Sequence, residues 1–262
     1  MPRYVERIWA GGLYVCREYF SLKARGKKVS RGALENPTSE LQKKINLKRK
    51  REKLKYMIHT NFREGDMWLG LTYKDKVTEE TAQREIRNFF RRLKRQRKKA
   101  GAEPVKYIYC THRKQNKIHH HVILNIQDMT PNEIKAVWGN GRVNITPLED
   151  QAGEEGYSRL AEYMTKEADE DEEGLEAYKQ IWIGSRNLEQ PKVEVVEYED
   201  AKRHGYIKIP KGYKEVRISV SNYPQMGIYR HYVLAIKIHG NDTRGRPRKK
   251  HPDNAASLPL MS

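Results

Sequence analysis

The alternation of apolar and polar residues divides the middle of the chain into short strands and amphipathic helices. Short apolar runs bounded by turn residues predict strands, and apolar residues three or four positions apart predict helices. Thr78 and the pair Thr130-Pro131 are typical helix starts, and Gly139 is a typical helix stop. In chain order, the patterns predict a strand at 67–73, a helix at 78–99, strands at 105–112 and 118–126, a helix at 131–138, a strand at 142–147 and a helix at 156–168.

This β-α-β-β-α-β order, followed by one further helix, is typical of an α+β fold of the ferredoxin-like or split-βαβ class. It predicts an antiparallel sheet that is covered on one face. Before it, an ordered extension and a loop lead to a long basic helix at about 38–61. After it, apolar runs predict an additional C-terminal β-rich segment. The predicted segments are therefore 1–61, 62–175, 176–239 and a basic, disordered tail at 240–262.

The charge of the chain favours a polyanionic partner. Its 52 lysines and arginines against 34 aspartates and glutamates give a formal net charge of +18, which makes nucleic acid the first candidate. No apolar run is long enough to span a bilayer, and there is no signal peptide or lipidation motif. Cys16 and Cys110 are too few for a disulfide framework. We therefore expect a cytoplasmic protein that acts on DNA and has no membrane partner.

Three consecutive histidines, His119 to His121, lie in the predicted strand KIHHHVIL. Because side chains alternate along a strand, His119 and His121 share one face, and His120 lies on the other. His112 ends the preceding strand and can lie across from them in a hairpin. Three imidazoles can hold zinc, and an open face of three ligands equally suits manganese or magnesium. Taken alone, such histidines are also compatible with ordinary surface or core positions.

Tyr163 and Lys166 lie three residues apart in the predicted helix that contains EYMTK. Residues at this spacing are neighbours on a helix surface. A phenol is a poor nucleophile at neutral pH, and a nearby positive charge favours attack by its oxyanion. The alternative is an ordinary surface pair of a tyrosine and a lysine.

MWLGLTY, KIHHHVIL and EYMTK, in this order on a β-α-β-β-α-β frame, resemble the three motifs of the HUH endonucleases. The resemblance covers about residues 65–170 and is greatest to the single-tyrosine rolling-circle replication initiators of phages, plasmids and small circular elements. It implies His119 and His121 as ligands of Mg²⁺ or Mn²⁺, Tyr163 as the nucleophile that becomes linked to the 5′ phosphate, and Lys166 as a cationic helper. The chain departs from the family at His112, where many relatives have a carboxylate or amide, and at His120, where they have a hydrophobic residue.

The resemblance implies nicking and joining of single-stranded DNA at an origin hairpin, which leaves a 3′ hydroxyl for a polymerase. The chain has no GxxxxGKS or GxxxxGKT loop, so a separate host helicase is implied. Two alternatives remain: a non-catalytic HUH-fold DNA-binding regulator, and a transposase or relaxase. Transposases usually pair the tyrosine with glutamine where this chain has Lys166, and relaxases tend to carry the tyrosine near the N-terminus. The oligomeric state is left open.

Candidate DNA contacts lie on basic segments and aromatic residues. The helix at 78–99 carries an arginine face, and 244–250 resembles the core of an AT-hook, which binds a narrow minor groove. The predicted contacts are Arg87, Arg91, Arg95, Arg244, Arg246 and Arg248. Trp68, Tyr107 and Tyr109 could stack on bases. The alternatives are solvated charged faces, a generic basic tail, and aromatic residues that pack in the core.

Overall fold

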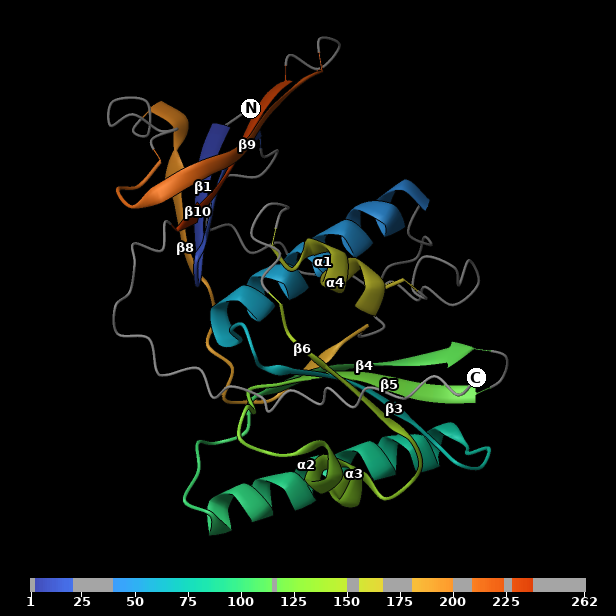
Figure 1. Cartoon of the computed structure of the whole chain (residues 1–262). Helices are drawn as coiled ribbons and strands as arrows, with labels where there is room; N and C mark the ends of the chain where they lie inside the picture. The colour runs from blue at the N-terminus through green and yellow to red at the C-terminus, as the bar shows by residue number, and fades with distance from the viewer. Residues whose placement is uncertain are drawn as a thin grey trace, which may run out of the picture.

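The computed structural model describes residues 3–20, 40–114, 117–149, 156–166, 181–199, 209–223 and 228–237. In this part of the chain, two five-stranded antiparallel sheets and four helices form a mixed α+β architecture (Figure 1). Among these residues, no helix combines the length and apolar character needed to cross a bilayer.

The central sheet has the strand order β6-β3-β5-β4-β7. Its strands are β3 (Met67–Thr72), β4 (Tyr107–Lys114), β5 (Lys117–Leu124), β6 (Val143–Pro147) and β7 (Ile183–Gly184). The four strands predicted at 67–73, 105–112, 118–126 and 142–147 are confirmed in this order along the chain, with small shifts at their ends, and β7 was not predicted. At the turn between β4 and β5, β4 continues past the predicted end at 112 to Lys114, and β5 begins at Lys117 rather than 118.

Helices cover both faces of the central sheet (Figure 1). α2 (Glu79–Lys99) and α3 (Pro131–Trp138) lie on one face, and α1 (Glu40–Asn61) and α4 (Ser158–Met164) lie on the other. The expectation that the sheet is covered on one face was wrong. Its strands carry apolar residues on both sides, and both sides must be removed from water: Val122 and Leu124 pack toward α2, whereas Ile123 packs toward α1 and α4.

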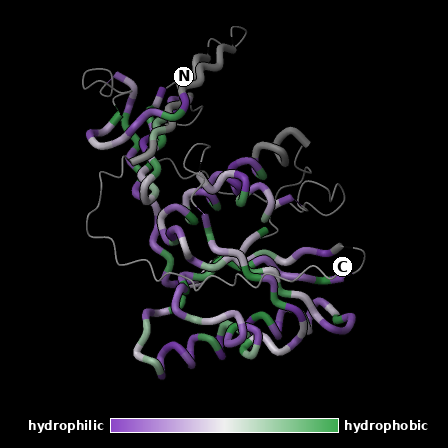
Figure 2. The backbone as a smooth tube through the Cα atoms, viewed as in Figure 1, coloured by the Kyte–Doolittle hydropathy of each residue, from purple (hydrophilic) through white to green (hydrophobic). Residues whose placement is uncertain are grey.

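Capping explains where α2 and α3 begin. The Thr78 side chain accepts a hydrogen bond from the backbone N–H of Thr81 at the start of α2. Thr130 and Glu133 form a capping box at the start of α3, and Gly139 ends that helix in the left-handed conformation. Hydrophilic residues dominate the side of α2 that faces away from the sheet (Figure 2). The predicted amphipathic helices are therefore confirmed, and the sequence itself sets their ends.

The second sheet joins the two ends of the described chain. Its order is β8-β1-β2-β10-β9, and its strands are β1 (Arg3–Ala10), β2 (Leu13–Phe20), β8 (Lys192–Glu197), β9 (Tyr213–Tyr223) and β10 (Ile228–Lys237). The sequence patterns assigned residues 1–61 and 176–239 to separate segments, whereas β1 and β2 form a hairpin that pairs with β8 and β10. This sheet packs on α1, where Ile8 and Leu13 share a core with Tyr56.

Candidate active site

His112, His119 and His121 form one cluster on the face of the central sheet that α1 and α4 cover. The β4–β5 pairing sets His112 opposite His119 and Cys110 opposite His121. Each histidine offers one ring nitrogen, and these three atoms all lie within 4.8 Å of one another. Metal–nitrogen bonds of about 2 Å would draw them modestly closer. The hairpin therefore gathers the three imidazoles that the alternation of side chains placed on one face.

His120 lies on the opposite face and has no room for a ligand role. Its ring is fully buried, and its two nitrogens are hydrogen bonded to the hydroxyls of Tyr73, at 2.8 Å, and Thr111, at 2.9 Å. Burial, followed by the electrostatic influence of His119 and His112, lowers the pKa of His120 to about 3. His120 is therefore a neutral core residue.

His121 has two buried ring nitrogens without a hydrogen-bond partner among the described residues. Burial, followed by the influence of His112 and His119, lowers the pKa of the His121 imidazole to about 3. The ring is therefore neutral. A buried polar group without a partner is costly and uncommon in native proteins. A divalent cation, which binds a neutral imidazole nitrogen, fits this position.

His112 connects the cluster to α4. Its Nε2 lies 3.0 Å from the main-chain oxygen of Met164. A carbonyl oxygen only accepts, so Nε2 carries the proton, and Nδ1 is the nitrogen with a lone pair in the neutral ring. A histidine ligand commonly donates its second N–H to a carbonyl in this way, which fixes its tautomer and orientation.

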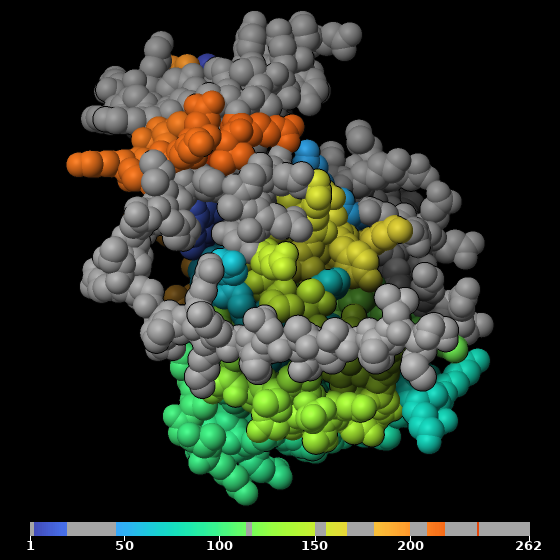
Figure 3. All heavy atoms as spheres, in the orientation of Figure 1, coloured from blue at the N-terminus to red at the C-terminus, as the bar shows by residue number. Residues whose placement is uncertain are grey.

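Tyr163 projects from α4 beside the three histidines. Its ring centroid lies 4.9 Å from that of His121 and 6.5 Å from that of His112. Trp68 packs edge-on against it at 5.5 Å and stacks on His121 at 5.9 Å. The side chain is 46% exposed, and α4 reaches the molecular surface in the space-filling view (yellow, Figure 3). The phenol is therefore next to the imidazoles and accessible from solvent.

Lys166 lies just beyond α4. The helix was predicted to continue to about residue 168, but it ends at Met164. The Thr165 hydroxyl donates to the carbonyl of Ala161 at 2.8 Å, which competes with the continuation of the helix. The backbone N–H of Lys166 still donates to the Tyr163 carbonyl at 3.3 Å, and the lysine side chain is exposed. Tyr163 and Lys166 therefore remain one turn apart.

The sequence patterns did not identify the contacts that hold α4 in place. Arg51 of α1 donates from Nε to the Thr165 hydroxyl at 2.9 Å. The backbone N–H of Tyr157 donates to Nε2 of His59 at 3.2 Å, and the two rings lie 4.7 Å apart. Both partners come from α1, more than ninety residues earlier in the chain. Only the helix pairing reveals them.

The predicted arginine contacts do not converge on the histidines. Arg87, Arg91 and Arg95 are exposed on α2, which lies across the sheet from the cluster. A helical pattern shows which residues face solvent, and it does not show which face of a sheet the helix covers. That these arginines contact DNA therefore stays a prediction, and such contacts would lie on the face of the sheet away from the histidines. Arg244, Arg246 and Arg248 lie outside the described residues.

Comparison with known proteins gives one finding. Residues 66–168, less than half of the 262-residue chain, match the model of the family described as "Replication-associated protein ORF2/G2P". The matched range contains β3 to α4, and with them the three histidines, Tyr163 and Lys166. No curated protein and no solved structure matches the chain.

Proposed function

We propose that this chain initiates rolling-circle DNA replication by nicking and rejoining a single strand of DNA through Tyr163, with a divalent cation at the three histidines. The observation that carries the proposal is the position of the exposed Tyr163 ring. Its centroid lies 4.9 Å from the ring centroid of His121, which belongs to a cluster of three convergent imidazoles. The match of residues 66–168 to a replication-associated family supports it, because the match includes every residue of this site.

The strand order also supports an assignment to the HUH endonucleases. Within the matched region the order is β6-β3-β5-β4, and α2 and α3 lie on the same face. This is the order expected of a ferredoxin-like sheet. The remaining face carries the histidines and α4, so the nucleophile and the candidate ligands share one side.

His112, His119 and His121 would hold Mg²⁺ or Mn²⁺. Such an ion, when bound, supplies Lewis-acid polarisation of the scissile phosphodiester. The neutral ring of His121 and the Nε2–H bond of His112 to the Met164 carbonyl suit this donor set. The chain itself then has to orient the phosphate and the nucleophile.

Tyr163 performs the transesterification in this proposal. Its Oη forms a bond to phosphorus as the bond from phosphorus to the 3′ oxygen breaks, which leaves a 5′-phosphotyrosine and a free 3′ hydroxyl. The phenol gives up one proton, and the departing oxygen gains one. Lys166, one turn away, adds positive charge that favours the phenolate. The reverse reaction rejoins the strand, and neither direction requires a nucleoside triphosphate.

The partners follow from this chemistry. The substrate is single-stranded DNA, presented in an origin hairpin, and the released 3′ hydroxyl is a primer for a host polymerase. Since the chain has no nucleotide-binding loop of the GxxxxGKS type, a separate helicase would unwind the duplex. A non-catalytic DNA-binding regulator would need none of these partners, and it would leave no covalent product.

The test is the covalent product. The full chain is incubated with single-stranded oligonucleotides tiled across the DNA that flanks its gene, with Mn²⁺ or Mg²⁺, and analysed by denaturing gel electrophoresis and mass spectrometry. We expect a DNA adduct on the peptide that contains Tyr163 and no adduct in EDTA. Tyr163→Phe abolishes the adduct and retains DNA binding.

Tyr157 provides the matched control. It belongs to the same segment, but it is buried against His59, so Tyr157→Phe keeps the adduct. An adduct that persists in Tyr163→Phe would move the nucleophile to another residue. DNA binding without any adduct across the tiled oligonucleotides would favour the regulator and overturn the proposal.

A further inference from the structure

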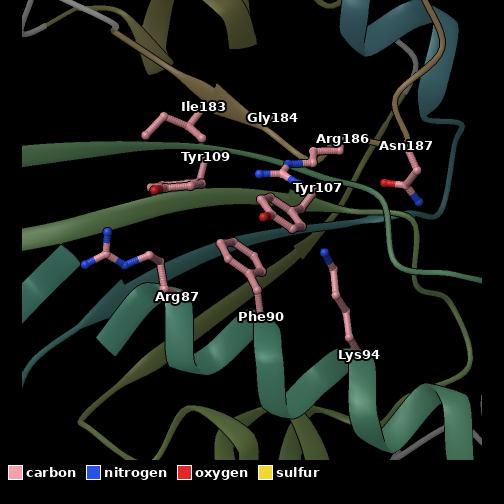
Figure 4. A pocket seen from close by; sticks show the side chains of 9 residues that line it. All are labelled: Arg87, Phe90, Lys94, Tyr107, Tyr109, Ile183, Gly184, Arg186 and Asn187. Carbon is pink, nitrogen blue, oxygen red and sulfur yellow. The ribbon is translucent and has the colours of Figure 1, made fainter. Parts of the chain in front are cut away.

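A groove of about 580 Å³ lies on the other side of the central sheet, between α2, β4 and the segment that contains β7. In Figure 4, three side chains reach from α2 toward two tyrosines of β4, and the β7 segment closes the far side. Its lining shares no residue with the histidine cluster. The lining residues are Arg87, Phe90, Lys94, Tyr107, Tyr109, Ile183, Gly184, Arg186 and Asn187.

One wall of the groove is aromatic. Tyr107 and Tyr109 are two residues apart on β4, so both point to the α2 face. The ring of Phe90 stacks on Tyr107, with centroids 3.6 Å apart and planes 5° from parallel, and lies 5.4 Å from Tyr109. Burial raises the pKa of both tyrosines, so their hydroxyls stay protonated and can donate hydrogen bonds. Phe90 and Tyr109 are 3% and 8% exposed and Tyr107 is half-buried, so Tyr107 is the ring of this wall that is most open to the groove.

The rim of the groove is cationic. Arg87 and Lys94 lie seven residues apart on α2, which is two turns, and Arg186 comes from the opposite side. All three side chains are exposed. Lys94 Nζ lies 5.1 Å from the centroid of the Tyr107 ring. Among the lining residues there is no carboxylate, so the groove has a local positive charge above ring surface.

We propose that this groove binds a second stretch of single-stranded DNA, outside the bond that Tyr163 cuts. Aromatic surface beside cations is the arrangement that holds single strands without sequence preference: bases stack on the rings and phosphates pair with the cations. The volume lies in the range of ligand pockets, about 300–1,000 Å³, and suits one or two nucleotides rather than a duplex. In this groove Arg87 would have the DNA role expected from the sequence.

The edge of the sheet offers a route between the two faces. β7 has two residues. Just before it, Trp182 packs with the core beneath α1 and donates from Nε1 to the Lys50 carbonyl at 3.4 Å. The next residue, Ile183, already lines the groove and is 38% exposed. A DNA strand that leaves the histidine face would therefore reach the groove by crossing only the two-residue edge strand β7. The identity of the ligand as DNA rests on the proposed function.

The test measures binding without cutting. Fluorescence anisotropy of a labelled 20-residue oligothymidylate is followed with the full chain in EDTA across a salt series. We expect Lys94→Ala combined with Arg186→Ala to weaken binding at least ten-fold and to reduce the salt slope by about 1.4, or about 0.7 for each lost contact with a single strand. Tyr107→Leu should weaken binding with the salt slope unchanged, because it removes ring surface and no charge.

The matched control is Lys99→Ala combined with Lys135→Ala, which removes the same charge from exposed positions of α2 and α3 outside the groove. Its affinity should change less than three-fold. Equal losses in the two double variants would overturn the groove as a DNA site. So would binding of a polyglutamate peptide to the wild-type chain and not to the groove variant, with oligothymidylate affinity the same in both. Because no cutting is measured, a chain that fails to form the tyrosine adduct can still pass this test.

Discussion

The Nε2–H of His112 donates a hydrogen bond to the main-chain carbonyl of Met164, the residue after Tyr163, across 3.0 Å. One side chain of the sheet thus holds the C-terminal end of the helix that presents the phenol. A cation bound at Nδ1 of His112 would make the opposite N–H a stronger donor, because the ring would become more positive. Occupancy of the histidine cluster and the placement of Tyr163 would then be linked through this bond.

The first prediction follows from this link. Addition of Mn²⁺ should slow hydrogen exchange of the backbone amides at 158–166 in the wild-type chain, and His112→Ala should remove the effect. Mass spectrometry of exchanged peptides measures it. Helix α3, on the other side of the sheet, is the internal control and should exchange at the same rate with and without Mn²⁺. Equal slowing of both helices would indicate a general stabilisation and contradict the link.

A second prediction separates His121 from His120. His121→Ala should weaken Mn²⁺ binding by about 100-fold or more and abolish nicking, since second-sphere changes alone cost about 10–100-fold. The metal-free variant should lose less stability than His120→Ala, because the ring nitrogens that it loses have no hydrogen-bond partner among the described residues. Isothermal titration calorimetry and urea unfolding measure the two effects.

His120→Ala should show the reverse pattern. It leaves the hydroxyls of Tyr73 and Thr111 without their partner and opens a cavity in the core, so it should lower the free energy of unfolding by about 2–4 kcal/mol. Mn²⁺ binding should persist in the folded protein. The opposite result would be loss of Mn²⁺ binding in a fully folded His120→Ala variant and retained binding in His121→Ala. It would show that the ligands lie on the α2 face of the sheet and contradict the proposed site.

The site shows what local patterns can and cannot predict. Strand alternation alone separates His119 and His121 from His120, because the period of two is a property of the backbone. The hairpin then brings in His112. The pairing of β1 with β8 joins residues almost two hundred positions apart, and no local pattern encodes such a contact. The same limit applies to the arginines of α2: their spacing predicts exposure, and the side of the sheet depends on how the chain crosses over.

A third prediction concerns the turn between β1 and β2. Gly11 has a positive φ of 55°, and a Cβ there would lie 1.9 Å from the carbonyl oxygen of His59. Gly11→Ala must therefore push the hairpin away from α1, in addition to the strain of about 1–2 kcal/mol that the left-handed conformation imposes. We expect a loss of at least about 3 kcal/mol in the free energy of unfolding.

Gly101→Ala is the matched control for this change. Gly101 has a similar φ of 62°, and nothing lies within 4 Å of the added Cβ. It should cost only the conformational strain of about 1–2 kcal/mol. Urea unfolding of the two variants measures the difference. The same loss in both would mean that the contact between the hairpin and α1 contributes nothing to stability.

The last prediction concerns pH and His59, which supports the segment before Tyr163 from α1. Burial, and then the Lys55 ammonium, lowers the pKa of His59 to about 3, and its Nε2 accepts the Tyr157 N–H. The unfolded chain takes up this proton near pH 6.5, so between about pH 6.5 and 3 it binds more protons than the folded chain. The stability that neutral His59 provides is complete above pH 6.5, and it falls as the pH falls, by about 1.4 kcal/mol per unit for one proton.

His59→Gln keeps a hydrogen-bond acceptor that does not titrate. Between pH 6.5 and 4.5, the free energy of unfolding from urea titrations should therefore decline less steeply in the variant, by about 1.4 kcal/mol per pH unit. Parallel declines in the wild type and the variant would show that His59 takes up its proton in the folded chain, and α4 would then need another explanation for its support.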